Sequence, residues 1–400
     1  MLAMRVVAVS LTLGLSLVVS TPRGQADTSN NVIGGQNAPA GKYPDMAGIV
    51  FGSGDRAAVE CTGVLVAPTV VLTAGHCNDP TLSAVIIGSH DLSIANAGQK
   101  IAVAKRLEYP NSQGSYDVTA LVLAAPATNA PRAIASGWAK FEIFDGAKAI
   151  FAGYGALDKN STTYVPQLQE ATSTITDGAC THSAGCVAAA KPAGELGAGG
   201  MGIDTCPGDS GGPLYIDTPF GMFVAGLTSR AYDNAMFDCS EGGLYVRPDK
   251  IIDWIEEVTQ VNVSRGPAPT AEAINIAGGE GGETRVVIND PKSTNHTFEV
   301  TQEPTRSRYA ISPDGRIRVC ADGAGAGTDA LKINVVDADH IERSLPVTIK
   351  INVAAGTAAT DCSLEFDASS GCGCQSDGNT GLGLLASVGV LGLLGRRRRA

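Results

Sequence analysis

Residues 204–214 read DTCPGDSGGPL. In this segment Ser210 stands beside an acid, Asp209, and between glycines on both sides. Glycine reaches backbone conformations that other residues avoid, so the N–H groups of Gly208 and Ser210 could be aimed at a single point. N–H groups aimed in this way stabilise negative charge that develops on a substrate oxygen. The segment therefore indicates a reactive serine with an oxyanion hole, and an ordinary turn is the weaker interpretation.

Two further segments carry the side chains that a reactive serine needs. The segment LTAGHC ends an apolar strand and contains His76, and the segment SYDVTALVL places Asp117 at the head of another apolar strand. A serine hydroxyl is a weak nucleophile at neutral pH, so it needs a base such as neutral imidazole to accept its proton. A buried Asp117 would fix the imidazole tautomer. Asp91 and Asp145 do not lead into a long apolar strand, which makes them weaker candidates for this role.

These segments, in this order, are similar to those of the trypsin-like (chymotrypsin-fold) serine proteases. The match extends to VIGG at 32–35, CTGVL at 61–65, GYG at 153–155 and an expected helix over 248–261. The resemblance implies an all-β, two-barrel protease domain over 32–262, closed by a C-terminal helix, with His76, Asp117 and Ser210 as the catalytic residues. The aspartate segment departs from the family pattern, since it reads DVTAL where DIAL is usual.

The resemblance also implies an activation step. In this family, cleavage before an Ile/Val-x-Gly-Gly sequence frees an α-amino group, which folds inward and pairs with the aspartate beside the serine. The corresponding residues here are Val32 and Asp209, so the chain is expected to be made as a zymogen with a short propeptide at 27–31. Asn31, and not Arg or Lys, precedes the bond, which leaves the identity of the activating protease open.

The primary specificity pocket is expected to have Asp204, six residues before the serine, at its bottom. A buried carboxylate there would pair with Arg or Lys of a substrate. The other expected pocket residues are Ser229, Ala231 and Gly243. The chain departs from the family at Ser229-Arg230-Ala231, where Ser-Trp-Gly is expected, so a methyl group and a charge would stand where the substrate backbone runs.

The chain has ten cysteines, and an exported protein can form disulfides from them. The resemblance implies the pairs Cys61–Cys77 and Cys206–Cys239. Cys180 and Cys186 would close a small loop, and Cys320 with Cys362 is a further hypothesis, because sequence alone does not give connectivity. No His and Cys cluster has metal-ligand spacing, and the proposed chemistry needs neither a metal nor another cofactor.

The overall charge excludes one class of partner. The 400 residues include 29 Lys plus Arg and 40 Asp plus Glu, a formal charge of −11, which argues against nucleic-acid binding. The 49 glycines and the low charged fraction of 17% favour turn-rich β structure.

Both ends of the chain are typical of targeting segments. Residues 1–26 have a basic start, the apolar run Val6–Val19 and small residues, which predicts a secretory signal peptide. Residues 356–380 form a low-complexity spacer, which carries a Gly-Cys motif with Cys372 and Cys374. An apolar segment and an Arg cluster follow at 381–400.

This C-terminal order resembles the bacterial MYXO-CTERM sorting signals. It implies membrane association through a short transmembrane helix, processing near the cysteines by a sorting peptidase, and retention at the cell surface or outer membrane. The apolar run is shorter than the roughly 20 residues that cross a bilayer, so a permanent anchor would be marginal. A plain terminal helix with a solvated basic run is the alternative interpretation.

Between the two ends, residues 263–273 are expected to form an extended linker, and residues 274–355 a small β-sandwich of the Ig or cadherin type. Strands are expected at 285–288, 297–300, 316–319 and 346–353, with a hairpin turn at Asp314-Gly315. This domain could be a stalk or a binding module. Asp337 and Asp339 could suggest calcium, but acidic residues beside a strand are usually only solvated.

The sequence therefore predicts a secreted, surface-retained serine endopeptidase that acts on proteins or peptides after Arg or Lys. The alternative is an inactive protease homologue that acts as a surface adhesin or binding protein. Arg230 and the Asn31–Val32 junction motivate this alternative. The intact set of His76, Asp117 and Ser210 favours the enzyme.

Overall fold

The computed structural model describes residues 32–190, 193–323, 325–357 and 362–366. The predicted signal peptide, the propeptide, Cys372, Cys374 and the apolar segment with its Arg cluster lie outside the described residues. Within the described ranges, no helix has the length and apolarity needed to cross a membrane.

The first barrel is built from strands that alternate between two apolar clusters. Along β3, Leu65 belongs to one cluster with Ile49 and Leu121, whereas its neighbours Val64 and Val66 belong to another. Successive strand residues point to opposite faces, so one β-branched run serves both the barrel interior and the surface against the second barrel. The closed order β2-β3-β4-β7-β6-β5 uses β2 (Met46–Phe51), β3 (Ala58–Ala67), β4 (Val70–Thr73), β5 (Leu82–Ile87), β6 (Gln99–Glu108) and β7 (Thr119–Leu123).

The second barrel closes through the pairing of β8 with β9. Its interior is filled by large side chains, among them Phe151 and Tyr245, whose rings stack with centroids 5.5 Å apart. Its strands, in the order β9-β10-β13-β12-β11-β8 with β1 added beside β9, are β1 (Gln36–Asn37), β8 (Lys148–Gly153), β9 (Gln169–Asp177), β10 (Glu195–Ala198), β11 (Pro213–Thr218), β12 (Gly221–Ala231) and β13 (Gly243–Val246). The expected two-barrel fold is confirmed.

A shared apolar cluster joins the barrels to the expected helix. The cluster contains Leu72 from the first barrel, Leu227 from the second and Ile255 from α1 (Ile252–Thr259). Gln260 ends the helix in the left-handed region at φ 57°. The remaining helical elements are the short 3₁₀-helices η1 (Gly54–Arg56), η2 (Gly75–Cys77), η3 (Ser112–Gly114), η4 (Gly137–Glu142), η5 (Ala188–Ala190) and η6 (Pro248–Lys250).

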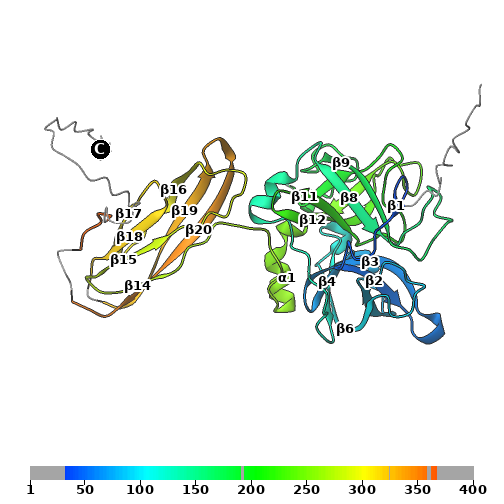
Figure 1. Ribbon diagram of the computed structural model, residues 1–400, viewed down its shortest axis with the longest axis horizontal. Helices are drawn as coiled ribbons and strands as arrows, with labels where there is room; N and C mark the ends of the chain where they lie inside the picture. Colours follow the sequence, from blue (N-terminus) through cyan, green and yellow to red (C-terminus); the bar gives the residue numbers. More distant parts are fainter. Residues whose placement is uncertain (1–31, 191–192, 324, 358–361, 367–400) are drawn as a thin grey trace, which may run out of the picture.

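A β-sandwich follows α1 and lies beside the two barrels (Figure 1). Its sheets have the orders β14-β20-β19-β16 and β15-β18-β17, and its core includes Ile317, Leu331 and Ile349. The strands are β14 (Ile274–Ala277), β15 (Gly281–Arg285), β16 (His296–Gln302), β17 (Ser307–Ile311), β18 (Arg316–Ala321), β19 (Gly327–Asp337) and β20 (His340–Ala354).

One predicted strand of the sandwich is wrong. The strand expected at 285–288 ends at Arg285, because Val287 pairs with Thr270 of the linker and not with β18. The other three expected strands lie within β16, β18 and β20, and the Asp314-Gly315 turn joins β17 to β18.

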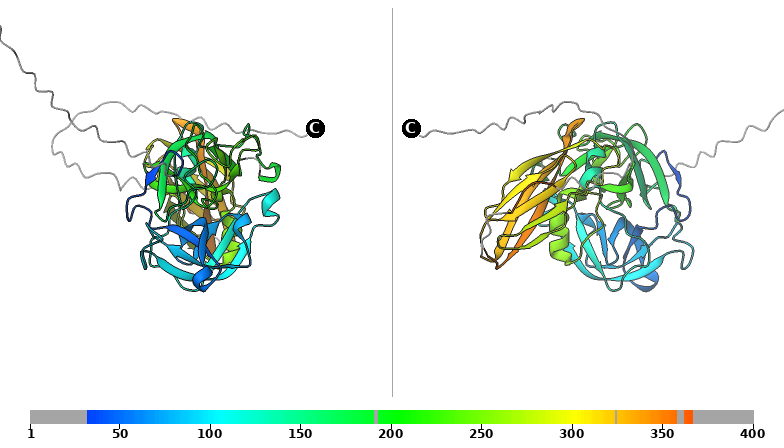
Figure 2. Two further views of the ribbon diagram at one scale, coloured as in Figure 1. Left: turned by 90° about the vertical axis from the view of Figure 1, so that its right-hand side faces the viewer. Right: turned by 60° about the vertical axis from the view of Figure 1, so that its left-hand side comes forward.

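The segment expected to be a linker is extended, but it is hydrogen-bonded on both sides. Gly266 donates to Ile134 of the two-barrel domain, and Thr270 exchanges hydrogen bonds with Val287 of the sandwich. Trp138 of η4 is fully buried in the core of the sandwich and donates its indole N–H to the carbonyl of Ile288 at 2.8 Å. Figure 2 shows the sandwich and the barrels from two further sides, in which they overlap.

Buried charges surround Trp138. Arg343 pairs with Glu142 of η4 at 3.0 Å and, inside the sandwich, with Asp290 and Asp337. Asp337 is 1% exposed, so the expectation that this acid is merely solvated is wrong.

All four expected disulfides are present: Cys61–Cys77, Cys180–Cys186, Cys206–Cys239 and Cys320–Cys362. The last of these attaches residues 362–366 of the predicted spacer to β18.

Candidate active site

His76 lies on η2, directly after β4, and faces Asp117. Its Nδ1 is 2.8 Å from Oδ2 of Asp117, and its backbone N–H donates to Oδ1 at 2.9 Å. A Cβ on the preceding residue, Gly75, would lie 2.7 Å from Ser112 and 2.9 Å from Asp117, so only glycine lets the two loops approach this closely. The aspartate thus fixes both the ring and the backbone of the histidine.

Asp117 is 7% exposed and also accepts a hydrogen bond from the Ser229 hydroxyl at 2.6 Å. Burial by itself would raise the pKa of Asp117, but the hydrogen bonds and charge of His76, together with Ser229, outweigh burial and lower that pKa. The side chain is therefore an anion at neutral pH. The competing candidates bond elsewhere, Asp91 to Ser93 and Gln167, and Asp145 to Gly178.

The backbone on both sides of Asp209 is held by one residue of β3. Thr62 donates its N–H to the carbonyl of Ser210 at 3.0 Å and its hydroxyl to the carbonyl of Gly208 at 2.8 Å. Gly208 has φ +98°, a conformation that favours glycine. Within the described part of the chain, no acceptor takes the N–H groups of Gly208 and Ser210, so both can donate to a ligand.

The histidine loop and the serine loop lie against one another. The sulfur of Cys77, which follows His76, is 3.8 Å from the carbonyl oxygen of Ser210, and its disulfide ties it to Cys61, the neighbour of Thr62. The structure therefore brings together the three segments that the sequence separates by up to 134 positions in the chain, from residue 76 to residue 210. Sequence reasoning missed Thr62. Its only signal is a hydroxyl within an apolar strand.

Asp209 is fully buried and holds two backbone donors. Its oxygens accept the N–H groups of Gly155 at 2.7 Å and Cys206 at 2.9 Å. A Cβ at Gly153 or Gly155 would overlap the carboxylate, which explains glycine at both positions of the GYG segment. Burial raises the pKa of Asp209 to about 7, and within the described residues no cation pairs with it.

The segment that begins at Val32 lies near the serine loop. Val32 is fully buried, and the carbonyl of Ile33 accepts the N–H of Asp204 at 3.4 Å. Gly34 has φ +79°, and a Cβ on it would lie 2.8 Å from the carbonyl oxygen of Gly202. The first described residues therefore pack against the segment that leads to Ser210.

A cavity of about 160 Å³ opens beside Ser210, with Asp204 in its lining. Asp204 is 1% exposed and accepts three backbone N–H groups, from Thr205, Ser240 and Gly242, at 2.8 to 2.9 Å. Burial outweighs these bonds and raises its pKa to about 6. The other expected pocket residues, Ser229, Ala231 and Gly243, line the same cavity.

Arg230 also lines this cavity, but its charge is compensated. Its guanidinium lies 2.7 Å from Glu195, whose side chain is 1% exposed. The charge expected at this position is therefore present in the cavity lining, and Glu195 compensates it. Sequence reasoning missed Glu195, which precedes Arg230 by 35 positions.

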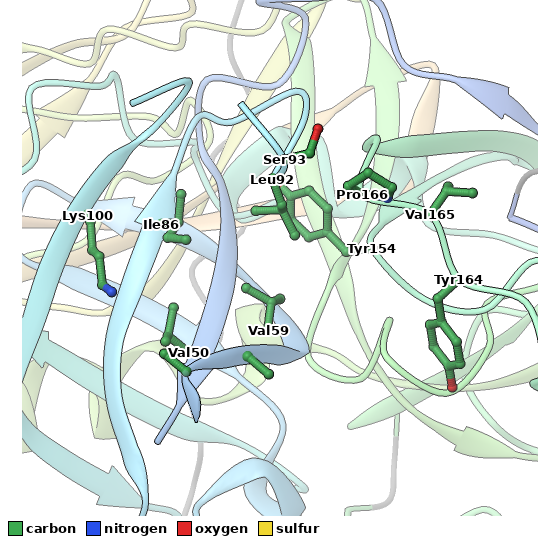
Figure 3. A pocket seen from close by; sticks show the side chains of 12 residues that line it. Val50, Val59, Ile86, Leu92, Ser93, Lys100, Tyr154, Tyr164, Val165 and Pro166 are labelled. Atoms are coloured by element: carbon green, nitrogen blue, oxygen red, sulfur yellow. The ribbon is translucent and has the colours of Figure 1, made fainter. Parts of the chain in front are cut away.

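A second, more apolar groove of about 470 Å³ lies where the two barrels meet (Figure 3). Val50, Val59 and Ile86 line it from the first barrel, and Tyr154 and Tyr164 from the second. Lys100 stands at the same groove and is the one charged side chain in its described lining. A Cβ on Gly208 would lie 3.5 Å from the ring of Tyr164, so this groove begins next to the serine loop.

Comparisons with known proteins match the two-barrel region to one family. The sequence profile described as Trypsin matches residues 32–255. A trypsin of Phaedon cochleariae is 30% identical over 275 residues, which cover 62% of this chain and 96% of that protein. Chymotrypsin-like elastase family member 1 of Canis lupus familiaris is 28% identical over 252 residues, 59% of this chain and 95% of that protein. The profile match ends within α1, before the sandwich.

Proposed function

Because the chain belongs to the trypsin family of serine proteases, we propose that it hydrolyses peptide bonds as a serine endopeptidase, with His76, Asp117 and Ser210 as its catalytic residues. The observation that carries the proposal is the 2.8 Å contact between Nδ1 of His76 and a buried, ionised Asp117, beside the serine loop. This contact leaves Nε2 of the ring as the atom that can accept a proton.

In the proposed reaction, Oγ of Ser210 attacks the peptide carbonyl carbon while its proton passes to His76. Asp117 stabilises the imidazolium, and the N–H groups of Gly208 and Ser210 receive the oxyanion. Collapse of the tetrahedral intermediate breaks the C–N bond, and His76 gives its proton to the leaving amine. Water then attacks the acyl-enzyme ester by the same route and releases the acid, which restores the Ser210 hydroxyl.

The proposed specificity is for Arg or Lys immediately before the cleaved bond. Asp204 supports it, because this carboxylate lines the cavity beside Ser210 and is buried without a cation partner among the described residues. A guanidinium or ammonium group in the cavity would stabilise the ionised form of Asp204 and supply the missing partner.

The groove beside Tyr164 is proposed to bind substrate residues that follow the cleaved bond. Its apolar lining favours an apolar side chain, and Lys100 favours an acidic one. The closeness of Gly208 to the ring of Tyr164 supports this proposal. A peptide bound at the oxyanion hole would enter the groove if it continues past Tyr164.

Activation is proposed to occur by cleavage before Val32. The new α-amino group would pair with Asp209, which is a fully buried acid held only by backbone N–H groups among the described residues. Such a pair would replace an uncompensated buried carboxylate by an ion pair, so it would order the serine loop. The activating protease would have to accept Asn31 before the bond.

The protein is proposed to be secreted and retained at the bacterial cell surface, where a sorting peptidase would process it near Cys372. The four disulfides support an oxidising compartment. The terminal segments that would direct export and retention are those predicted from the sequence.

Labelling with a fluorophosphonate tests the enzyme against the inactive homologue. The chain cleaved before Val32 should react at one serine, and the Ser210→Ala variant should not. Equal labelling of the two proteins, or no labelling of either, would favour the binding protein instead.

A further inference from the structure

The side chain of Arg230 bridges a buried carboxylate and the serine that bonds to Asp117. Its Nη1 donates to Oε1 of Glu195 at 2.7 Å and to Oγ of Ser229 at 3.0 Å. Glu195 opens β10 and Arg230 lies near the end of β12, and these two strands flank β13. Ser229 in turn donates to Oδ2 of Asp117 at 2.6 Å. A continuous chain of hydrogen bonds therefore runs from Glu195 to the imidazole of His76.

The direction of this chain is fixed by chemistry. A guanidinium has donors only, so the Ser229 oxygen must accept the hydrogen bond from Arg230. A hydroxyl has a single proton, and an ionised carboxylate has none. Since Oγ of Ser229 is already an acceptor toward Arg230, its proton points to Asp117. Without the arginine, the same hydroxyl could rotate toward other acceptors.

From this geometry we propose that Arg230, held by Glu195, is a positioning residue: it orients the Ser229 hydroxyl toward Asp117 and thereby holds the imidazole of His76. The inference rests on the proposed function for its catalytic consequence. Its geometric part, the orientation of Ser229 and His76, does not depend on turnover.

The guanidinium of Arg230 donates hydrogen bonds on several sides. A residue that positions another side chain must itself be held in this way. Its Nη2 donates to the carbonyl of Gly185 at 2.6 Å, inside the loop closed by Cys180 and Cys186. The second oxygen of Glu195 accepts the N–H of Val187 at 2.7 Å. The arginine is thus fixed to this loop and the glutamate to the residue that follows it, and the two side chains are 31% and 1% exposed.

Within the described residues, Arg230 is the cation that pairs with Glu195. Arg247, which lies just after β13, is 5% exposed and pairs with Asp249 at 2.9 Å. Truncation of Arg230 alone would leave Glu195 as an unpaired buried anion, and this would disturb the fold for a reason unrelated to positioning. A useful variant must therefore change both partners of the pair.

The test uses the chain cleaved before Val32 and a peptide cleaved after arginine. The double variant Glu195→Gln/Arg230→Met removes both charges while retaining side chains of similar length. We expect kcat to fall roughly 10-fold, because general acid–base catalysis weakens when its base is poorly oriented, with KM unchanged within about twofold. Arg230→Lys keeps the positive charge beside Glu195 but not the planar fork of donors, so its kcat should fall less than that of the double variant.

A double-mutant cycle with Ser229→Ala separates positioning from other effects. If Arg230 acts through the Ser229 hydroxyl, then the Glu195→Gln/Arg230→Met change should cause no further loss of kcat in the Ser229→Ala background. A further loss of the same size in that background overturns the inference. A change confined to KM also overturns it, because Arg230 would then contact substrate.

A second readout does not need turnover. The proton on Nδ1 of His76 gives a downfield NMR resonance when it is held by a carboxylate, and this resonance should shift or broaden alike in the double variant and in Ser229→Ala. A resonance identical to that of the wild type in the double variant overturns the inference. If wild-type protein fails to react with a fluorophosphonate, the proposed function fails, and the resonance still decides the positioning role.

Discussion

The hydroxyl of Thr62 lies 2.8 Å from the carbonyl oxygen of Gly208, while its own N–H donates to the carbonyl of Ser210. These two carbonyls flank the segment whose N–H groups are proposed to receive the oxyanion. Thr62 is fully buried, so water cannot replace a lost donor there. One residue of the first barrel therefore sets the geometry of a loop in the second.

Replacement of this hydroxyl should weaken catalysis more than binding. Thr62→Val has nearly the same shape, but it leaves the Gly208 carbonyl without its partner, which typically costs about 1–3 kcal/mol for a buried group. We expect kcat to fall by roughly one order of magnitude with little change in KM, measured with a peptide cleaved after arginine. Thr62→Ser, which retains the hydroxyl, is the control. Equal kcat in the Val and Ser variants would contradict the argument.

The uncleaved chain should lose stability as pH rises from about 4 to about 7. Burial raises the pKa of Asp209 to about 7, above its ordinary value of 3.8, so the folded state holds this proton more tightly than the unfolded state. Unfolding free energy therefore falls across this window, by up to about 4 kcal/mol from this one group, and is constant above it. Denaturant unfolding at several pH values measures the slope.

Asp209→Asn should remove the larger part of this pH dependence, and the smaller contribution of Asp204, with a pKa of about 6, should remain. Cleavage before Val32 should also abolish the Asp209 contribution, since an α-amino partner would lower the pKa of the acid. The same slope in wild type and Asp209→Asn would show that other groups cause the dependence.

The proposed specificity pocket gives a third prediction. Asp204→Ser replaces the buried carboxylate in the 160 Å³ cavity by a small neutral group. We expect kcat/KM for a peptide with arginine before the bond to fall at least 100-fold, because a charged hydrogen bond worth about 3 kcal/mol is lost. The matched measurement uses a peptide with leucine at that position, for which kcat/KM should not fall. A parallel fall for both peptides would mean that Asp204 maintains the fold and does not select substrates.

Reversing the charge of Lys100 tests whether the groove in Figure 3 binds substrate. Lys100→Glu should raise KM for peptides that carry an acidic residue after the cleaved bond and lower KM for the corresponding lysine peptides. The side chain is exposed, so the effect on each should be modest, about threefold, and should decline with added salt. Lys105→Glu, on the same strand but outside the groove lining, is the control. An identical response of the two variants would remove the groove from substrate binding.

The sequence predicted the two barrels because their segments carry short local motifs, and the resemblance based on those motifs also implied the pairs Cys61–Cys77 and Cys206–Cys239. The small Cys180–Cys186 loop and the hypothetical Cys320–Cys362 pair did not depend on a motif, and the structure contains both. The sequence did not predict the roles of Thr62, Glu195 or Trp138, because each of these acts on residues that are distant in sequence. Thr62 bonds across 146 positions, and Trp138 across 150. From the sequence, Arg230 supports an inactive homologue, because its partner Glu195 lies in no recognisable motif. These contacts form because separate segments of the chain pack together, and no periodic pattern in the sequence predicts them.

Trp138 provides a final prediction about the sandwich. Its ring is fully buried among side chains of the sandwich core, although it belongs to η4 of the protease region. Trp138→Ala would leave a large cavity at this junction, and such substitutions typically cost about 3–5 kcal/mol. We expect the thermal midpoint to fall, and we expect proteolysis to cut the linker at 263–273, which the docked sandwich otherwise protects by its hydrogen bonds. Phe144→Ala is the matched control, because that ring is 54% exposed and its loss should change neither measurement. If Trp138→Ala leaves the linker as resistant as in the wild type, the hydrogen bonds of the linker hold the sandwich in place without the indole.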